Sequence, residues 1–399
     1  MIKVGVIFGG ESVEHEVSII SAVQAMKHID REKYEVVPVY IGKNREMWTG
    51  RFLDDVSCFT DMDMMKRYAK NVVMYMKDGK VVLQNKKGFR RIVDSFDIAL
   101  PIVHGTNVED GTLQGFLALN GIPYAESNLF AAAVGQDKVF MKQIFEAEGI
   151  KVPKYIWFLD VDYLNDKDKV IKDIEKIGYP VIVKPARLGS SIGIERAHDK
   201  NELIDAIEEA IKYDEKIVVE EMIPNLTEVN ASVLGEGFNY KVGVLEEVMG
   251  TDEFLSYEDK YIGEGKKGGK LKGNMSKGML STSRKIPAQI SKKQEEEIIE
   301  ISKKAARALN TSGVVRIDYL INKKTNQVYI NEINTIPGSL SFYLWEPVGK
   351  KYSELLDDII KDGIKEYKKK LKRTYSFDSN ILSNYNGCKG AKGMKGKLR

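Results

Sequence analysis

Residues 313–321 read Gly-Val-Val-Arg-Ile-Asp-Tyr-Leu-Ile, and residues 327–334 read Gln-Val-Tyr-Ile-Asn-Glu-Ile-Asn. Both segments are rich in β-branched and aromatic residues and alternate with polar ones, which is typical of strands. Residues 322–326 between them, Asn-Lys-Lys-Thr-Asn, favour a turn. The pattern therefore predicts a β-hairpin.

Four polar side chains of this hairpin are expected to meet on one face. Residues two apart on a strand share a face, so Arg316 lies with Asp318, and Glu332 lies with Asn334. Folding about the turn brings Asp318 within a residue or two of Glu332. Two carboxylates and an amide oxygen suit Mg²⁺, which completes its shell with water and phosphate oxygens. The alternative is a solvent-facing strand pair whose charges point to water.

Two flanking segments suggest what such a cation would serve. The turn at residues 334–338, Asn-Thr-Ile-Pro-Gly, can aim a backbone N–H at a developing oxyanion. Upstream, the small residues of 189–193, Gly-Ser-Ser-Ile-Gly, let backbone amides approach a triphosphate, with Lys138 and Lys184 as countercharges. Alone, this loop is equally well explained as an ordinary glycine turn beside two surface lysines.

The N-terminal segment offers a second polar group. A strand at residues 2–8 breaks at Gly9 and Gly10, Ser12 is predicted to cap the helix that follows, and Glu14 and Ser18 lie one helical turn apart. His104 follows another predicted strand. All of them should reach the carboxyl edge of a parallel sheet, where ligands of α/β folds bind. The alternatives are acids that only offset the helix dipole and a histidine that bonds neighbouring backbone.

The whole chain alternates predicted strands and helices, first as a parallel α/β sheet and then as α+β units. Further strands are expected at 35–41, 97–103, 154–159, 180–184 and 217–221, and helices at 113–119, 129–134, 138–148, 168–177, 201–213, 291–309 and 353–371. We place domain boundaries near residues 126, 216 and 371. Residues 250–283 are glycine-rich and aperiodic, which predicts a long loop.

Composition excludes several classes of protein. The 399 residues are 43% hydrophobic and carry two cysteines and four histidines without zinc or disulfide spacing, and the apolar start lacks the features of a signal peptide. A cytoplasmic protein is expected. Residues 368–399 carry eight Lys and two Arg against one Asp, so this tail is basic and expected to be disordered, while the rest of the chain is acidic. A GxGxxG at 263–268 follows no strand, and no Walker A loop or nucleophile elbow occurs.

With these pieces in order, the sequence over about residues 1–370 resembles the D-alanine–D-alanine ligases of the ATP-grasp superfamily. The resemblance implies a three-domain fold of class α/β and α+β: an N-terminal Rossmann-like parallel-sheet domain (1–126), a central ATP-grasp subdomain (127–216), a C-terminal one (217–371) with a lid at 250–283, and the tail (372–399). The matching motifs are Gly9-Gly10 with residues 14–18, His104-Gly105 with residues 109–115, Asp137-Lys138, residues 183–185 with 189–193, Lys260-Tyr261, residues 316–318, and residues 331–338.

The resemblance also implies roles for individual residues. Glu14 binds the ammonium group of the first D-alanine, and Ser190 and Tyr261 join it in a triad that closes the lid. The expected site residues are, for the intermediate, Arg316 and Gly338; for substrates, Glu14, Ser18, His104, Lys260, Tyr343 and Leu344; for ATP, Lys138, Lys184, Ser190, Ser191, Glu220, Glu221, Glu228, Lys260 and Asn331; and for two Mg²⁺ ions, with Mn²⁺ as a substitute, Asp318, Glu332 and Asn334.

Two departures leave alternatives open. The lid is longer than usual and lysine-rich, and Tyr343 stands where the family commonly has a serine for the second substrate's carboxylate. The second substrate is therefore D-alanine, D-serine or D-lactate, or the chain is another ATP-grasp carboxylate–amine ligase. A non-catalytic module with a polymer-binding tail ranks lower, because it would need no metal or phosphate groups. We expect a homodimer that binds D-alanine and ATP, and neither nucleic acid nor membrane.

Overall fold

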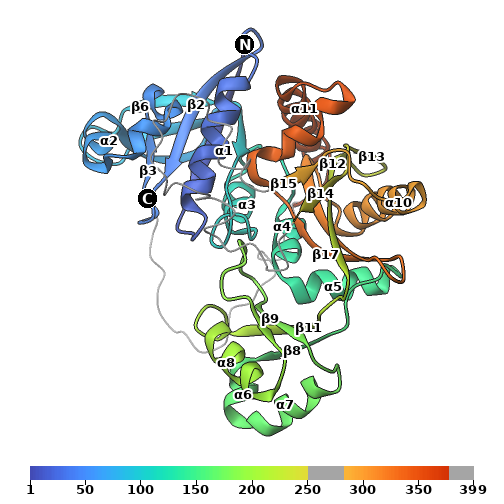
Figure 1. The fold of residues 1–399 in the computed structure, drawn as a ribbon. Helices are drawn as coiled ribbons and strands as arrows, with labels where there is room; N and C mark the ends of the chain where they lie inside the picture. The colour runs from blue at the N-terminus through green and yellow to red at the C-terminus, as the bar shows by residue number, and fades with distance from the viewer. Residues whose placement is uncertain (250–282, 377–399) are drawn as a thin grey trace, which may run out of the picture.

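The computed structural model of the protein describes residues 1–249 and 283–376. The predicted lid residues Lys260 and Tyr261, the GxGxxG segment and most of the basic tail lie outside this part of the chain. Among the helices of the described residues, none is long and apolar enough to cross a membrane. Figure 1 shows three groups of elements along the colour bar, each built around its own sheet.

The first sheet has seven strands in the order β6-β5-β4-β3-β2-β1-β7. The predicted parallel part is present, because β1 (Ile2–Gly9) pairs in parallel with β2 (Tyr34–Ile41) and β7 (Ile98–Pro101). The antiparallel strands that extend it were not predicted: β3 (Met47–Thr49), β4 (Lys70–Lys77), β5 (Lys80–Asn85) and β6 (Ile92–Phe96). The helices of this part are α1 (His15–His28), η1 (Arg51–Asp54), η2 (Val56–Phe59), α2 (Met62–Tyr68) and α3 (Thr112–Leu119).

The start of α1 differs from the prediction. Its N-cap residue is Glu14, with no side-chain cap. The Ser12 hydroxyl oxygen instead accepts a hydrogen bond from the Glu14 N–H at 3.1 Å. Ser12 was therefore wrongly assigned as the cap, because the turn after Gly10 continues two residues further than the sequence pattern suggests.

The central part has a four-stranded sheet in the order β10-β9-β11-β8. Its strands are β8 (Tyr155–Leu159), β9 (Val181–Pro185), β10 (Glu195–Ala197) and β11 (Lys216–Glu221), all antiparallel to their neighbours. The helices α6 (Asp160–Asn165), α7 (Lys167–Glu175) and α8 (Lys200–Ala210) belong to the same part. Two helices precede it, α4 (Leu129–Gln136) and α5 (Lys138–Ala147).

The third sheet follows the order β15-β14-β12-β16-β17, with β13 paired to β12. Its strands are β12 (Leu226–Glu236), β13 (Asn239–Val242), β14 (Glu246–Met249), β15 (Ser283–Lys285), β16 (Val314–Asn322) and β17 (Gln327–Asn334). The last two form the predicted hairpin. The helices are α10 (Lys292–Leu309), η3 (Gly338–Leu344), η4 (Glu346–Val348) and α11 (Tyr352–Leu371).

Within the described residues, four apolar clusters hold these layers, and the two largest cross the predicted boundaries. The first core combines the N-terminal sheet with α11, through residues such as Leu355 and Ile359. The second combines the third sheet and α10 with α5, through Met141 and Phe145, and Figure 1 shows α5 beside the third sheet. The N- and C-terminal parts therefore bury apolar surface against each other, while the central sheet has a core of its own.

Candidate active site

The hairpin places its polar residues as the strand pattern predicts. In the antiparallel pairing of β16 and β17, Asp318 lies opposite Glu332, and Arg316 lies opposite Asn334. The Arg316 guanidinium donates two hydrogen bonds to the Asp318 carboxylate, at 2.7 and 2.8 Å, and Asn334 Nδ2 donates a third at 3.3 Å. The two carboxylates and the amide therefore share one patch of the sheet.

The chemistry of this patch suits a hard cation. Its donors are all oxygens, from Asp318, Glu332 and Asn334, which is the set that Mg²⁺ prefers when water and phosphate complete the shell. Within residues 1–249 and 283–376, no group of three or more His, Cys, Asp or Glu side chains could hold a metal on its own. Burial lowers the pKa of Arg316, but the Asp318 carboxylate outweighs it and raises that pKa well above its ordinary value. The patch thus keeps one fixed positive charge beside its carboxylates.

Two predicted lysines lie near these ligands, one beside Glu332 and one beside Asn331, the residue before it. Lys138 Nζ is 3.5 Å from Glu332 and donates to the Leu188 carbonyl oxygen at 2.8 Å. Lys184 donates to Glu220 at 2.9 Å and to Asn331 Oδ1 at 3.2 Å. The phosphate-binding lysines predicted from sequence are therefore beside the metal patch.

Lys142 completes this cluster and was not predicted. It is fully buried, lies 3.2 Å from Glu220, and follows Lys138 by one turn of α5, a spacing that places both on one helix face. Burial lowers the pKa of Lys142. Burial also raises the pKa of Glu220, but Lys142 and Lys184 outweigh it and hold that pKa below its usual value. The i, i+4 spacing from Lys138 was the signal that could have identified Lys142.

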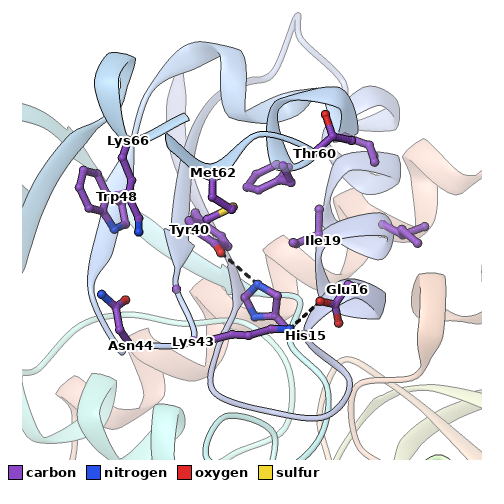
Figure 2. Close-up of a pocket in the computed structure, with 14 residues that line it drawn as sticks. His15, Glu16, Ile19, Tyr40, Lys43, Asn44, Trp48, Thr60, Met62 and Lys66 are labelled. Atoms are coloured by element: carbon purple, nitrogen blue, oxygen red, sulfur yellow. Dashed lines mark hydrogen bonds and ion pairs between the residues drawn. The ribbon is translucent and has the colours of Figure 1, made fainter. Parts of the chain in front are cut away.

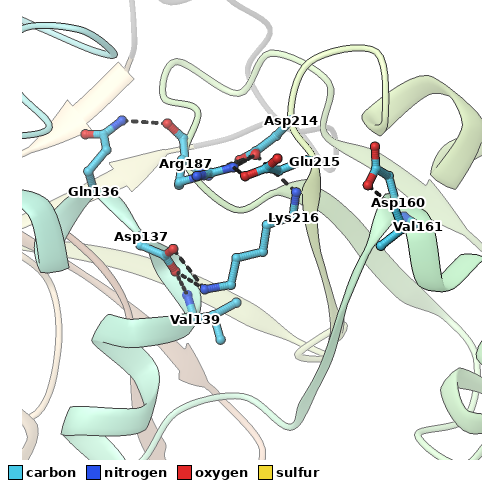
Figure 3. Close-up of polar contacts among 9 residues, drawn as sticks. All are labelled: Gln136, Asp137, Val139, Asp160, Val161, Arg187, Asp214, Glu215 and Lys216. Carbon is cyan, nitrogen blue, oxygen red and sulfur yellow. Dashed lines mark hydrogen bonds and ion pairs between the residues drawn. The ribbon is translucent and has the colours of Figure 1, made fainter.

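Ion pairs connect the glycine-rich loop and the start of α5 to residues at the start of β11 in the central sheet (Figure 3). Asp137 caps α5 by accepting from the N–H groups of Val139 and Phe140, both at 3.0 Å, and its carboxylate also accepts from Lys216 Nζ at 2.9 and 3.0 Å. At the base of the loop, Arg187 pairs with Asp214. These contacts hold the backbone around Lys138 and at the start of the loop that carries Ser190.

Glu14 meets the glycine-rich loop from the N-terminal part. Glu14 is 8% exposed, and its carboxylate accepts a hydrogen bond from the Ser190 hydroxyl. A Cβ on Gly189 would lie 2.8 Å from a Glu14 carboxylate oxygen, and one on Gly105, which has φ +82°, would lie 2.6 Å from it. Only residues without a side chain leave room for this carboxylate, so the two loops close around it.

A network of buried side chains holds the turn that carries Gly338. The Ser18 hydroxyl oxygen accepts from the His104 N–H at 2.9 Å, and the Ser21 hydroxyl lies 3.0 Å from His104 Nε2 and accepts from the Ser339 N–H at 3.0 Å. Because the Ser21 oxygen already accepts, its own proton can go to the histidine ring. Burial lowers the pKa of His104 to about 4, so the ring is neutral at pH 7.

Glu109 ties the same turn to the loop of Gly105. One carboxylate oxygen accepts from the Gly105 N–H and the other from the Ile336 N–H, both at 3.0 Å. Burial, with a further contribution from Glu14, raises the pKa of Glu109 to about 8. The sequence motif contained Glu109, but no role was predicted for it, because its second partner lies 227 residues away.

The remaining predicted residues are placed as follows. Ser190 and Ser191 both have positive φ values, 55° and 59°. Glu220 and Glu221 are neighbours on β11, so their side chains point to opposite faces, and Glu221 accepts from the Lys154 N–H at 2.9 Å. Glu228 lies on β12 opposite Leu320. Leu344 is buried and its carbonyl oxygen accepts from the Val244 N–H at 2.9 Å, while the Tyr343 hydroxyl donates to Glu246 at 3.1 Å.

A separate cavity of about 540 Å³ opens in the N-terminal part and is lined mainly by apolar side chains (Figure 2). His15 borders it, with Nδ1 2.6 Å from the Gly10 carbonyl oxygen and Nε2 3.0 Å from the Tyr40 hydroxyl. Burial lowers the pKa of His15. The cavity lining contains none of the predicted site residues, so the convergence of polar groups, rather than cavity size, marks the candidate site.

The chain is similar to known proteins along most of its length. The family models described as "D-ala D-ala ligase N-terminus" and "D-ala D-ala ligase C-terminus" match residues 3–127 and 144–361. A D-alanine–D-alanine ligase from Thermosipho melanesiensis is 39% identical over 385 residues, covering 96% of this chain and 98% of the relative. One from Natranaerobius thermophilus is 40% identical, covering 90% of this chain and 94% of the relative.

Solved structures show the same likeness. The VanG D-Ala:D-Ser ligase from Enterococcus faecalis is 30% identical, with a TM-score of 0.74, and covers 91% of this chain and 99% of its own. A D-alanine–D-alanine ligase from Bacillus anthracis complexed with ATP is 26% identical, with a TM-score of 0.64, and covers 93% of this chain and 100% of its own. The ATP-grasp fold predicted from sequence is confirmed, and this chain belongs to the D-alanine–D-alanine ligase family.

Proposed function

We propose that this protein joins two D-alanine molecules into D-alanyl-D-alanine, with ATP converted to ADP and phosphate, as a step in peptidoglycan precursor synthesis in the cytoplasm. The observation that carries this proposal is the meeting of two polar groups from distant parts of the chain. Asp318 and Glu332 lie beside Lys138 and Lys184, while the Glu14 carboxylate lies against the glycine-rich loop at Ser190. One site can thus bind a nucleotide and an ammonium group together.

The first step activates a carboxylate. A carboxylate oxygen of the first D-alanine attacks the γ-phosphorus of ATP, ADP leaves, and an acyl phosphate forms. Glu14 binds the ammonium group of this substrate, and Lys138 and Lys184 lie where they neutralise phosphate charge. Asp318, Glu332 and Asn334 would hold two Mg²⁺ ions, with Mn²⁺ as a substitute, and these ions would neutralise charge on the phosphates. We assign ATP binding also to Ser191, Glu220, Glu221, Glu228 and Asn331.

The second step forms the peptide bond. The second D-alanine binds as an ammonium and gives up one proton to solvent. The free amine nitrogen then attacks the carbonyl carbon of the acyl phosphate, the C–O bond to phosphate breaks, and the proton that the nitrogen loses goes to the released phosphate. Arg316 and the Gly338 N–H stabilise the oxyanion that forms, because the buried Arg316 charge is already in place before the reaction. The turn of Gly338 is held through Glu109 and Ser21. Ser18, His104 and Leu344 support the substrate pocket, and we assign lid closure to Lys260 and Tyr261.

Purified full-length protein tests the proposal with ATP, Mg²⁺ and D-alanine as the only substrates. We expect phosphate release and a dipeptide of the mass of alanyl-alanine, both dependent on D-alanine. The Glu332→Gln variant is the matched control and should release phosphate only at background. Equal, background release from both proteins would overturn the proposal. We also propose a homodimer, and analytical ultracentrifugation at assay concentration gives the oligomeric state directly.

A further inference from the structure

A polar cluster at the start of β14 surrounds Tyr343, one of the expected substrate residues. Its centre is Glu246, whose carboxylate is 1% exposed. One carboxylate oxygen accepts from Asn230 Nδ2 at 2.7 Å and from the Tyr343 hydroxyl at 3.1 Å, and the other lies 3.3 Å from Arg284 Nη1. The Arg284 guanidinium also lies 5.3 Å from the centre of the Tyr343 ring.

Strand register places this cluster next to the proposed metal ligands. Asn230 lies opposite Glu246 on one side and opposite Asp318 on the other, and Asp318 lies opposite Glu332. Residues directly opposite in antiparallel strands point to the same face, so these four side chains form one row across the sheet. Two strand spacings separate Glu246 from Asp318, which is about 10 Å.

Tyr343 and Arg284 both reach the same side of the sheet as this row. Arg284 lies opposite Val248, which is two residues from Glu246 and so shares its face. The positive charge of Arg316 opposes the rise in the pKa of Tyr343, so the two groups lie within electrostatic range of each other. Tyr343 and the side chain of Arg284 are only partly buried, whereas Glu246 is not accessible. A ligand beside the metal row would therefore meet Tyr343 and not Glu246.

Glu246 fixes the direction in which Tyr343 can form hydrogen bonds. A carboxylate can only accept hydrogen bonds. The Tyr343 hydroxyl therefore donates its single proton to Glu246. Burial and the nearby Glu246 charge raise the pKa of Tyr343 to about 12, so the phenol is protonated at neutral pH. Its oxygen then has only lone pairs to offer a ligand. It accepts an N–H or O–H, and it repels a carboxylate oxygen.

We infer that Tyr343, oriented by Glu246, is a specificity-determining residue whose hydroxyl oxygen accepts a hydrogen bond from the amino group of the second substrate. The inference rests on the proposed ligase function. A charged ammonium donor forms a stronger bond than the neutral hydroxyl of a 2-hydroxy acid, so this geometry favours an amino acid as acceptor. Glu246 is a positioning residue, and Arg284 balances its charge.

The test measures acceptor binding separately from ATP binding. Tyr343→Phe keeps the ring and removes the oxygen, and we expect the KM for the second D-alanine to rise roughly tenfold, the size expected for a charge-assisted hydrogen bond. The KM for ATP should stay within about twofold. Tyr329→Phe is the matched control, because its hydroxyl bonds Gln327 at 2.5 Å near the turn of the hairpin. It should change neither KM.

A second variant reverses the bond rather than removing it. In Glu246→Gln the amide oxygen can accept from Arg284 while the NH₂ donates to the Tyr343 oxygen, which frees the phenol proton for the ligand. Asn230 donates to the same position in wild type, so its amide must turn in the variant and accept the second N–H of that NH₂. With D-alanine as donor and D-alanine and excess D-lactate competing as acceptors, mass spectrometry gives the ratio of dipeptide to depsipeptide. We expect this ratio to fall several-fold in both Tyr343→Phe and Glu246→Gln.

Two outcomes separate failure of this inference from failure of the proposed function. If the wild-type protein forms dipeptide while both variants keep the acceptor KM and the product ratio within about twofold of it, Tyr343 does not select the acceptor. If the wild-type protein forms no dipeptide, the ligase function itself is wrong. A variant that unfolds earlier than wild type but keeps its acceptor KM also counts against the inference, because a purely structural role predicts that result.

Discussion

Glu14 accepts a hydrogen bond from Ser190, although 176 residues separate them in the chain. The contact joins the first helix of the N-terminal part to the glycine-rich loop of the central part. Both partners stand on fixed backbone, since the Glu14 N–H donates to Ser12 and Arg187 anchors the loop through Asp214. The first substrate is therefore expected to bind where the N-terminal and central parts of the chain meet. Its affinity should depend on the contact between Glu14 and Ser190.

Replacing Glu14 with Gln should weaken the first substrate selectively. The change removes the negative charge that faces the ammonium group while it keeps a hydrogen-bonding side chain. We expect kcat/KM for the first D-alanine to fall roughly ten- to a hundredfold, which is the size of one charged hydrogen bond. Steady-state kinetics at saturating ATP measure it. Glu11→Gln is the control, because the Glu11 carboxylate pairs with Arg45 at the surface, and an equal loss there would contradict the assignment.

Asp318→Asn should lower activity and raise the Mg²⁺ requirement together. The substitution leaves an oxygen ligand but removes one of the two charges opposite each other in the hairpin. We expect kcat to fall by roughly a hundredfold or more, with half-maximal activity at higher Mg²⁺ concentration. A Mg²⁺ titration of phosphate release measures both values. The exposed Glu300, which pairs with Lys303, supplies the control Glu300→Gln. An unchanged titration in Asp318→Asn would exclude Asp318 as a ligand.

The sequence predicted those parts of the fold that depend on local pattern. Strong periodicity placed α10 and α11 and both strands of the hairpin within a residue or two, and the period of two set the faces of Asp318 and Glu332. The short strands β3 to β6 were missed, because segments of three to eight residues carry little periodic signal. They pair with neighbouring strands and contribute side chains such as Met74 and Leu83 to the first apolar core.

The contacts that complete the site could not be predicted, because they depend on tertiary structure. Glu109 bonds Ile336, and Tyr343 bonds Glu246, across 227 and 97 residues. Neither the type nor the spacing of these residues in the chain indicates the partner. Lys142 was only partly predictable. The sequence contains its helical spacing from Lys138, but it does not indicate that Lys142 is buried against Glu220. The domain boundaries at 126, 216 and 371 stay predictions.

The buried pair of Asp137 and Lys216 should be a large stability element. Both side chains are about 6–7% exposed, and Lys216 Nζ also lies 3.6 Å from the centre of the Phe140 ring. Lys216→Met leaves the Asp137 charge buried without its partner, so we expect a loss of roughly 3–5 kcal/mol in the free energy of unfolding. Lys167→Met breaks the exposed pair with Glu208 and should lose about 1 kcal/mol or less.

Urea unfolding of the two lysine variants and wild type, followed by circular dichroism, measures the difference. Equal losses from both variants would show that Lys216 gains nothing from its burial beside Asp137. The same data test the cap, because Asp137→Asn keeps an oxygen for the N–H groups of Val139 and Phe140 but removes the charge. That variant should be destabilised less than one that loses the cap as well, such as Asp137→Ala.

The pH dependence of stability should identify Glu109. Burial raises its pKa from the ordinary 4.5 to about 8 in the folded protein, with Glu14 adding to the rise and the two N–H donors opposing it. Between these values the folded state holds a proton that the unfolded state has released. Since stability rises with pH only where the unfolded state binds more protons, this group makes stability fall as pH increases through that window. Its contribution is fully present below pH 4.5 and is lost as pH rises through about 8.

Glu109→Gln cannot ionise, so it should flatten this part of the curve. We expect the free energy of unfolding of wild type to fall more steeply than that of the variant from pH 4.5 to about 8. Chemical denaturation at several pH values gives the free energy of unfolding of each protein as a function of pH. In the difference between the two curves, the contributions of the titratable groups that both proteins share cancel. Glutamine has one acceptor oxygen for the N–H groups of Gly105 and Ile336, so a constant offset is expected as well. Parallel curves would mean that Glu109 is ionised at pH 7, because the two N–H donors then outweigh burial in setting its pKa.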